Sequence, residues 1–286
     1  MADRPLSVGM NLRKVNSKDF DYKKMETLIE QAYLDGNRGV SHKRKVSFAP
    51  SSIGYGHGTC PRRWYLSFAG AEFDESSDAV GIATMENGSA THDRLQRLFK
   101  SAGIAIEIEK EMNVLNPPIR AFIDVIAEVD GIKAIIEIKS TRDESFVHRR
   151  YGATPMAYHL YQLLLYMYFE GIDQGAIMYE NKNDNTILTL PVRMNDYTRK
   201  IIEDAIEWMT MVYENWKQDA TFETTEDTNP LDVKSDGYVE SSYENLPKRP
   251  FTKRSKECKQ CPLFNECWNI QPEGTVDLPP MEVVKL

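Results

Sequence analysis

The stretch that decides the fold is residues 119–139, IRAFIDVIAEVDGIKAIIEIK. It holds two runs rich in β-branched residues, 119–129 and 132–139, which only Asp130 and Gly131 separate. An Asp-Gly pair between such runs is a strong signal for a β-hairpin with a type I′ turn. The sequence therefore predicts an antiparallel hairpin that turns at these two residues.

The predicted hairpin brings charged residues together on one face. A two-residue turn fixes the pairing of the strands, and Asp124 then lies opposite Glu137 with the Cβ atoms about 5 Å apart. Lys139 follows on the same face, two residues along the strand. Opposed carboxylates repel each other unless a cation lies between them, and oxygen ligands suit Mg²⁺ or Mn²⁺. We expect a divalent-metal site here, and the alternative is a solvated polar face where the two acids meet by accident.

Apolar periodicity predicts the remaining elements. Helices are expected at residues 22–36, 84–102, 155–170 and 195–217, and strands at 104–115, 175–181 and 186–192. On the second helix, His92 shares an inward face with Leu95 and Leu98. The strand that follows is expected to turn its isoleucines to one face, namely Ile104, Ile106 and Ile108. This order predicts an α/β domain with a central mixed sheet flanked by helices.

The composition is that of a globular chain, with 41% hydrophobic and 27% charged residues. Apolar runs are too short for a transmembrane helix, and residues 1–20 lack the apolar stretch of a secretory signal. We therefore expect a cytoplasmic protein with no membrane partner. The net charge of −8 argues against a simple basic nucleic-acid binder, yet the acids concentrate in 219–246 and a basic stretch, 247–261, follows.

Four cysteines form a second candidate site. Cys60 stands alone, whereas Cys258, Cys261 and Cys267 form a Cys-x2-Cys-x5-Cys run. In a cytosolic chain such a set indicates a metal or iron–sulfur site, and the alternative is scattered buried cysteines. Basic and aromatic residues follow Cys60 and basic residues precede Cys258, as in channels that bind single strands.

The charged hairpin residues resemble a nuclease signature. Asp124 followed by Glu137-x-Lys139 resembles the motif of the PD-(D/E)XK nuclease superfamily. That motif strictly opens with Pro-Asp, and here Ile123 precedes the aspartate.

Three further motifs make the resemblance more specific. Gly88-x3-His92 resembles the histidine motif of the RecB-like branch, and Gln162-x3-Tyr166 resembles the QxxxY motif of that branch. The cysteine pattern resembles its iron–sulfur subset, which includes AddAB-type nuclease domains and CRISPR-associated RecB-like exonucleases. The compact length resembles phage-encoded examples.

The resemblance implies a restriction-endonuclease-like core, with N- and C-terminal arms that are joined by a metal cluster. It implies a Mg²⁺- or Mn²⁺-dependent DNA exonuclease that acts on single strands or DNA ends in recombination, repair or phage DNA metabolism. A non-catalytic DNA-binding subunit with the same fold and an RNA-processing nuclease are the alternatives. No Walker A motif occurs, so any helicase or recombination partner would be a separate chain.

The resemblance also implies roles for individual residues. The expected catalytic residues are Asp124, Glu137, Lys139, Gln162 and Tyr166. The expected ligands of Mg²⁺ or Mn²⁺ are His92, Asp124, Glu137 and the backbone carbonyl of Ile138. The expected ligands of a 4Fe–4S cluster, with zinc as the rival occupant, are Cys60, Cys258, Cys261 and Cys267. The expected DNA contacts are Arg62, Arg63, Lys182, Lys253 and Arg254, although a lysine at a strand end such as Lys182 is as readily explained as surface.

The same observations divide the chain into five expected parts. These are an N-terminal helical extension (1–50), a helical arm with the first cysteine and the histidine motif (51–103), the nuclease core (104–218), an acidic then basic loop (219–257), and the C-terminal cysteine cluster with its tail (258–286).

Overall fold

The computed structural model describes residues 20–36, 45–74, 78–222, 239–269 and 273–284. Two compact units divide the chain, one of Met1–Val40 with Ser77–Thr84 and one of Ser41–Ser76 with Met85–Leu286. In the first unit, α1 (Tyr22–Gly36) matches the predicted helix. Both candidate sites belong to the second unit.

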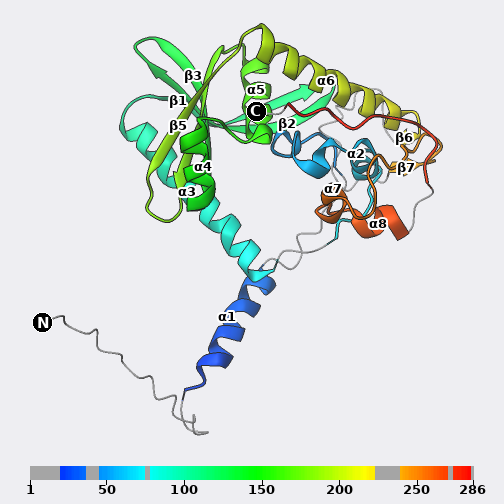
Figure 1. The fold of residues 1–286 in the computed structure, drawn as a ribbon, viewed down its shortest axis with the longest axis horizontal. Helices are drawn as coiled ribbons and strands as arrows, with labels where there is room; N and C mark the ends of the chain where they lie inside the picture. The colour runs from blue at the N-terminus through cyan, green and yellow to red at the C-terminus, as the bar shows by residue number, and fades with distance from the viewer. Residues whose placement is uncertain (1–19, 37–44, 75–77, 223–238, 270–272, 285–286) are drawn as a thin grey trace, which may run out of the picture. The chain divides into compact units, whose positions relative to one another are not determined.

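A five-stranded mixed sheet forms the centre of the second unit (Figure 1). Its strands, in the order β1-β2-β3-β4-β5, are Ala105–Leu115, Pro118–Val129, Ile132–Thr141, Gln174–Asn181 and Ile187–Arg193. The strands β1, β2 and β3 form an antiparallel meander, β4 runs parallel to β3, and β5 is antiparallel to β4. A parallel neighbour requires a crossover, and α4 (Asp143–Gly152) and α5 (Ala157–Glu170) lie within it. The predicted mixed α/β sheet is confirmed.

The hairpin turns where the sequence predicts. Asp130 and Gly131 have φ values of 52° and 77°, as a type I′ turn requires. The strands pair in the predicted register from Val129–Ile132 to Val125–Ile136. Asp124 and Glu137 come next along the two strands, beyond the last recorded pair.

The first strand departs from simple alternation. Its pairing with β2 shifts between Ala105 and Glu107, as at a β-bulge, and Glu109 has a φ of 50°. An extra residue turns the following side chains to the opposite face. Ile106 is the extra residue of this shift and is 43% exposed, whereas Ile104 and Ile108 are half-buried, so the prediction that the three isoleucines share one face is wrong. Leu98 is likewise exposed on α3 (Ala79–Ser101), whereas Leu95 is buried as predicted.

Helices supply the rest of the core. Helix α6 (Asp196–Lys217) begins with a capping box between Asn195 and Thr198. The short helix α2 (Pro61–Phe68) is buried at every residue, and Phe68 packs against Trp216 of α6. None of the described helices is long and apolar enough to cross a membrane.

Shorter elements complete this unit. They are the 3-10 turns Pro50–Ser52 and Gly56–Thr59, the paired strands β6 (Ala220–Phe222) and β7 (Val239–Ser241), and the helices α7 (Lys256–Lys259) and α8 (Phe264–Asn269). Of the predicted acidic loop, residues 223–238 lie outside the described residues, as do 1–19 and 37–44 of the expected N-terminal extension.

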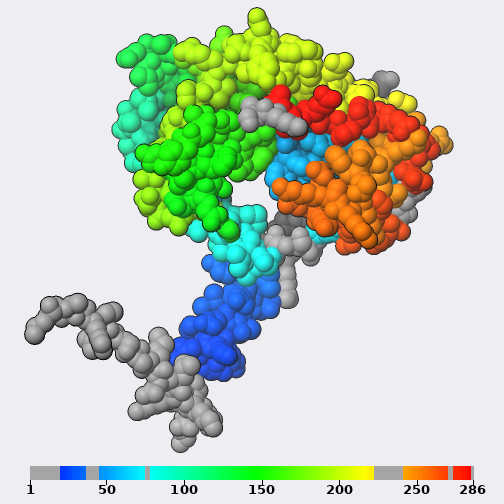
Figure 2. Space-filling view, viewed as in Figure 1, coloured from blue at the N-terminus to red at the C-terminus, as the bar shows by residue number. Residues whose placement is uncertain are grey.

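The C-terminal segment, red in Figure 2, lies across the surface of this unit. The backbone N–H of Met281 donates to the carbonyl of Thr59 at 2.9 Å. Trp208 of α6 donates its indole N–H to the carbonyl of Pro279 at 2.9 Å. These bonds connect the C-terminal segment to α6 and to the residues that precede α2.

Candidate active site

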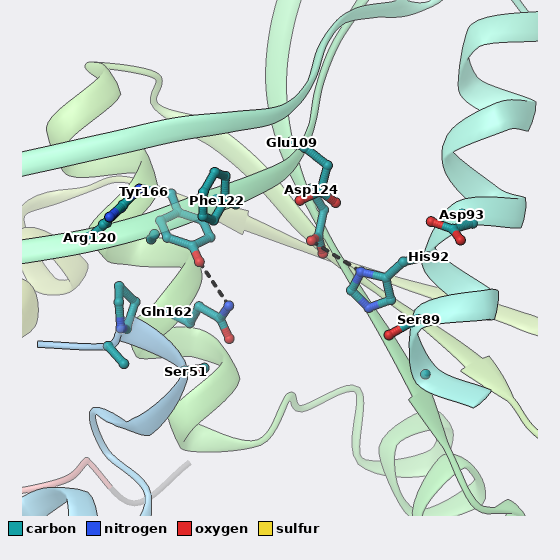
Figure 3. Close-up of a pocket in the computed structure, with 14 residues that line it drawn as sticks. Ser51, Ser89, His92, Asp93, Glu109, Arg120, Phe122, Asp124, Gln162 and Tyr166 are labelled. Atoms are coloured by element: carbon teal, nitrogen blue, oxygen red, sulfur yellow. Dashed lines mark hydrogen bonds and ion pairs between the residues drawn. The ribbon is translucent and has the colours of Figure 1, made fainter. Parts of the chain in front are cut away.

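A pocket of about 550 Å³ lies where α3, β1, β2 and α5 meet (Figure 3). Its charged and polar lining includes His92, Glu109, Asp124, Gln162 and Tyr166. Four of these five residues were predicted as site residues from the sequence, and the structure brings them together from three separate elements.

Asp124 connects the two sides of this pocket. Its Oδ2 accepts a hydrogen bond from the backbone N–H of Ile138 at 2.7 Å, and its Oδ1 lies 3.2 Å from Nδ1 of His92. Burial lowers the pKa of His92, but the hydrogen bond and charge of Asp124 more than compensate, so the net pKa is raised. His92 therefore faces the carboxylate from α3, as the periodicity of that helix predicts.

Glu109 is a functional candidate that the sequence did not reveal. His92, Glu109 and Asp124 each offer a ligand atom, and the three atoms lie within 4.8 Å of one another. Its chain neighbours pair as Ile108–Val125 and Lys110–Ile123, so Glu109 stands across from Asp124. A carboxylate, an imidazole and a second carboxylate at this spacing suit a divalent cation.

Glu137 is the most deeply buried acid of the site. It has no exposed surface; its Oε1 pairs with the ammonium of Lys139, and its Oε2 has no partner. Burial raises its pKa to about 7, while the ammonium of Lys139, 2.5 Å from Oε1, works in the opposite direction. A buried carboxylate with one oxygen unpaired is costly, and a cation ligated by that oxygen would reduce the cost. The donor set therefore fits Mg²⁺ or Mn²⁺.

Lys139 keeps its positive charge in this environment. Burial lowers the pKa of the ammonium, but the charges of Glu137 and Asp124 outweigh it and raise the net value. The ammonium is thus a permanently charged hydrogen-bond donor beside the two carboxylates, on the face where the hairpin register predicts it.

Gln162 and Tyr166 face the pocket from consecutive turns of α5. The amide of Gln162 donates to the hydroxyl of Tyr166 at 2.9 Å (Figure 3). Burial raises the pKa of Tyr166 well above its usual range, so the hydroxyl stays neutral. The Gln162 Oε1 atom is buried without a partner. The pair can therefore offer a hydroxyl and an amide to a bound molecule.

The four cysteines line one cavity of their own. Cys60 precedes α2, and the others come from α7, the turn after it and α8, so two distant segments meet there. Burial raises the pKa of Cys60 to about 12 and that of Cys261 to about 11, and the neighbouring thiols add to both shifts. Four convergent thiols in an enclosed cavity fit a thiolate-ligated metal centre.

Two predicted DNA contacts are wrong. Arg62 is fully buried, where it donates to Sγ of Cys267 at 3.2 Å and to the carbonyl of Pro247 at 2.8 Å. Arg63 is 5% exposed and lies over the Trp64 ring at 3.9 Å. Because every residue of α2 is packed within the protein, neither guanidinium lies on a surface that DNA could reach.

The other three predicted DNA contacts are exposed. Lys182 follows the end of β4, and Lys253 and Arg254 precede α7. Lys253 lies 5.6 Å from the ring of Phe264. Among the described residues none of these three lines the active-site pocket, where the exposed cation is Arg120. Their contact with DNA stays a prediction.

No family model and no curated protein matches the sequence. Among solved structures, the fold is similar to that of the protein SSO0001, with a TM-score of 0.40 and 16% identity over 88% of this chain and 98% of that one. It is also similar to the alkaline exonuclease LHK-Exo of Laribacter hongkongensis, with a TM-score of 0.45 and 11% identity over 64% of this chain and 92% of that one. The complex of LHK-Exo with dAMP gives a TM-score of 0.45 and 14% identity over 67% and 93%. At these TM-scores, what the site can do has to be deduced from its own residues.

Proposed function

We propose that this protein is a divalent-metal-dependent DNA nuclease that removes nucleotides from single strands or DNA ends. One observation carries the proposal: the carboxylate of Glu137 is fully buried, pairs through Oε1 with the ammonium of Lys139, leaves Oε2 without a partner and stands beside a second acid. A solvated polar face, the alternative reading of these residues, would leave this carboxylate in water. The motif resemblance supplies the substrate class.

The metal would be held by His92, Asp124, Glu137 and the backbone carbonyl of Ile138, with Glu109 as a further carboxylate at the same place. When bound, such an ion lowers the pKa of a ligated water and stabilises charge on a phosphoryl oxygen.

The lysine and the α5 pair have separate tasks. The ammonium of Lys139 orients the attacking water and donates hydrogen bonds to the phosphoryl oxygens, whose charge increases as the water oxygen bonds to phosphorus. The attacking water gives up one proton to solvent, the bond from phosphorus to the leaving oxygen breaks, and that oxygen takes a proton from solvent. Tyr166 and Gln162 would donate to the phosphate from the opposite wall and hold it in line.

The four cysteines would hold a centre that fastens the segment 256–269 to α2. The resemblance implies a 4Fe–4S cluster there, and zinc is the rival. The cysteine cavity and the pocket at Asp124 share none of the described lining residues, so the cysteines take no part in the proposed chemistry. Its proposed task is structural.

The test is a cleavage assay with anaerobically purified protein. End-labelled linear single-stranded DNA, linear duplex, circular single-stranded DNA and RNA are each incubated with Mg²⁺, Mn²⁺ or EDTA. We expect loss of linear DNA with either metal, resistance of the circle and no reaction in EDTA. The variant Glu137→Gln should be inactive, whereas Glu128→Gln, an exposed acid on the same hairpin, should cleave at the wild-type rate.

Two outcomes would overturn the proposal. Wild-type activity in the Glu137→Gln variant would exclude this pocket as the catalytic site. Tight DNA binding without cleavage under any metal condition would support the non-catalytic DNA-binding subunit instead.

A further inference from the structure

The cysteine cavity contains polar groups that its own residues do not satisfy. Arg63 lines the cavity, and its Nε and Nη1 atoms are buried without a hydrogen-bond partner. Nδ1 of His57, on the same lining, is buried and unpartnered as well. These groups surround the place where the four thiols converge.

Unpaired donors of this kind require an explanation. More than nine in ten buried polar groups find a partner, and a buried charged group without one is especially costly. The Trp64 ring lies 3.9 Å from the guanidinium and attracts its positive charge. The ring offers no oxygen or sulfur acceptor to the N–H groups, which point outward in the plane of the guanidinium. An occupant of the cavity can supply the missing acceptor.

The neighbouring arginine shows which acceptor chemistry suits this site. Nε of Arg62 already donates to Sγ of Cys267 at 3.2 Å. Arg63 has no such bond from Nε or Nη1 to any of the four cysteines. A single zinc ion adds a charge but no acceptor atom, whereas an iron–sulfur cluster brings inorganic sulfides that accept hydrogen bonds.

We propose that Arg63 donates hydrogen bonds from Nε and Nη1 to the sulfides of an iron–sulfur cluster held by the four cysteines. The inference rests on the proposed cysteine centre and is independent of the nuclease chemistry. Four thiolates give such a cluster a net negative charge, and the two buried guanidiniums of Arg62 and Arg63 compensate it. Arg63 is therefore a positioning residue that stabilises the reduced, more negative state of the cluster.

Substitutions at Arg63 test this role. Wild type, Arg63→Gln and Arg63→Lys are purified anaerobically, their iron and acid-labile sulfide are measured, and the reduction potential is titrated by electron paramagnetic resonance. We expect a more negative potential in the glutamine variant and an intermediate one in the lysine variant, which keeps the charge but not the planar donors. The control Lys259→Gln removes an exposed charge from α7 and should leave the potential unchanged.

A measurement on the wild-type protein covers the case in which the variants do not fold. Resonance Raman spectra in H₂O and D₂O separate the stretching modes of bridging sulfides from those of terminal thiolates. Donation from Arg63 predicts a deuterium shift in the bridging modes, and the bond from Arg62 to Cys267 predicts one in a terminal mode.

Three results would overturn the inference. They are zinc without labile sulfide, bridging modes that do not shift in D₂O, and an Arg63→Gln potential equal to that of wild type. None of these measurements uses DNA. A protein that shows the expected shifts but does not cleave DNA would therefore refute the proposed nuclease and leave the role of Arg63 intact.

Discussion

Asp124 accepts a hydrogen bond through Oδ2 from the backbone N–H of Ile138 at 2.7 Å, just beyond the last recorded pair of the β2–β3 ladder, Val125–Ile136. The side chain of one strand thus takes the place that a backbone carbonyl would have in a continued ladder. Its other oxygen, Oδ1, faces His92. One carboxylate oxygen therefore connects the strands while the other stays available to the site.

This division of roles predicts different effects of two substitutions. Asp124→Asn keeps an oxygen that accepts from Ile138 but loses the charge, so it should fold normally and cleave DNA at least about 100-fold more slowly. Asp124→Ala also leaves the N–H unpaired, which should lower the free energy of unfolding by about 1–3 kcal/mol. Urea unfolding and the end-labelled DNA assay measure the two effects. Equal stability of both variants would contradict the connecting role.

A pH effect follows from Glu137. Burial raises its pKa from 4.5 to about 7, so the folded state favours the protonated acid more than the unfolded state does. The protonated acid therefore stabilises the folded state fully when the pH is below the pKa of the unfolded state, 4.5, and this stabilisation is lost as pH rises through about 7. In EDTA, the unfolding free energy of wild type should fall relative to that of Glu137→Gln across this window. Mn²⁺ should restore it at the upper end. A constant difference between the two proteins would contradict the prediction.

His92 should matter more for metal than for DNA. Its ring lies at the Asp124 carboxylate, so His92→Ala should weaken Mn²⁺ binding by at least about 10-fold. DNA binding in EDTA should change little. Calorimetric Mn²⁺ titration and fluorescence anisotropy measure the two affinities, with His148→Ala, an exposed histidine of α4, as the control. An unchanged Mn²⁺ titration would make His92 a packing residue.

Loss of one cysteine should release the C-terminal segment. Ligation by thiolates couples metal binding to folding, so Cys261→Ala should lose the metal centre and become sensitive to trypsin within residues 248–259. The neighbouring exposed residue supplies the control, Gln260→Ala. Mass spectrometry of the fragments and thiol titration follow the outcome. Four titratable thiols in a protease-resistant native protein would exclude the proposed centre.

An ion pair between a partly exposed arginine and a buried glutamate anchors the helix that carries His92. Arg94 donates from Nη2 to both carboxylate oxygens of Glu180 at 2.6 Å, and Glu180 is 2% exposed. Arg94→Ala leaves that charge buried and unpaired. The free energy of unfolding should fall by about 1–3 kcal/mol, less than for a fully buried pair, because Arg94 is itself partly exposed. Arg97→Ala on an exposed position of α3 should cost less than about 0.5 kcal/mol in the same urea titration. Equal losses would show that the pair does not anchor the helix.

The features that the sequence predicts correctly are those set by residues close together along the chain. The Asp130-Gly131 turn is local, and it fixes the register that carries Asp124, Glu137 and Lys139. Helix α4 was missed because only Phe146 of its residues is buried, so no apolar periodicity marks it. Its acids in the first turn and its arginines in the last are favourable to the helix dipole but are a weak signal.

The remaining errors come from distant parts of the chain. Glu109 lies opposite Asp124 because β1 and β2 keep one register from Leu115–Pro118 to Glu107–Ile126, and the residues of β1 alone do not show which residues of β2 they pair with. Arg62 and Arg63 stand among aromatic residues, a pattern typical of a nucleic-acid surface. Their burial depends on α6 and on the segment 247–268, which lie far from them in the sequence.

The meeting of Cys60 with the cysteines of α7 and α8 also sets an order of events during synthesis. A ribosome adds roughly 5–20 residues per second, so Cys60 waits on the order of tens of seconds before Cys258 is made. All five strands of the sheet are translated in that interval. The carboxylate site can therefore assemble while the cavity still lacks three of its four cysteines. With the iron–sulfur centre proposed above, a cell short of iron would be expected to accumulate chains with a formed sheet and an unfastened C-terminal segment.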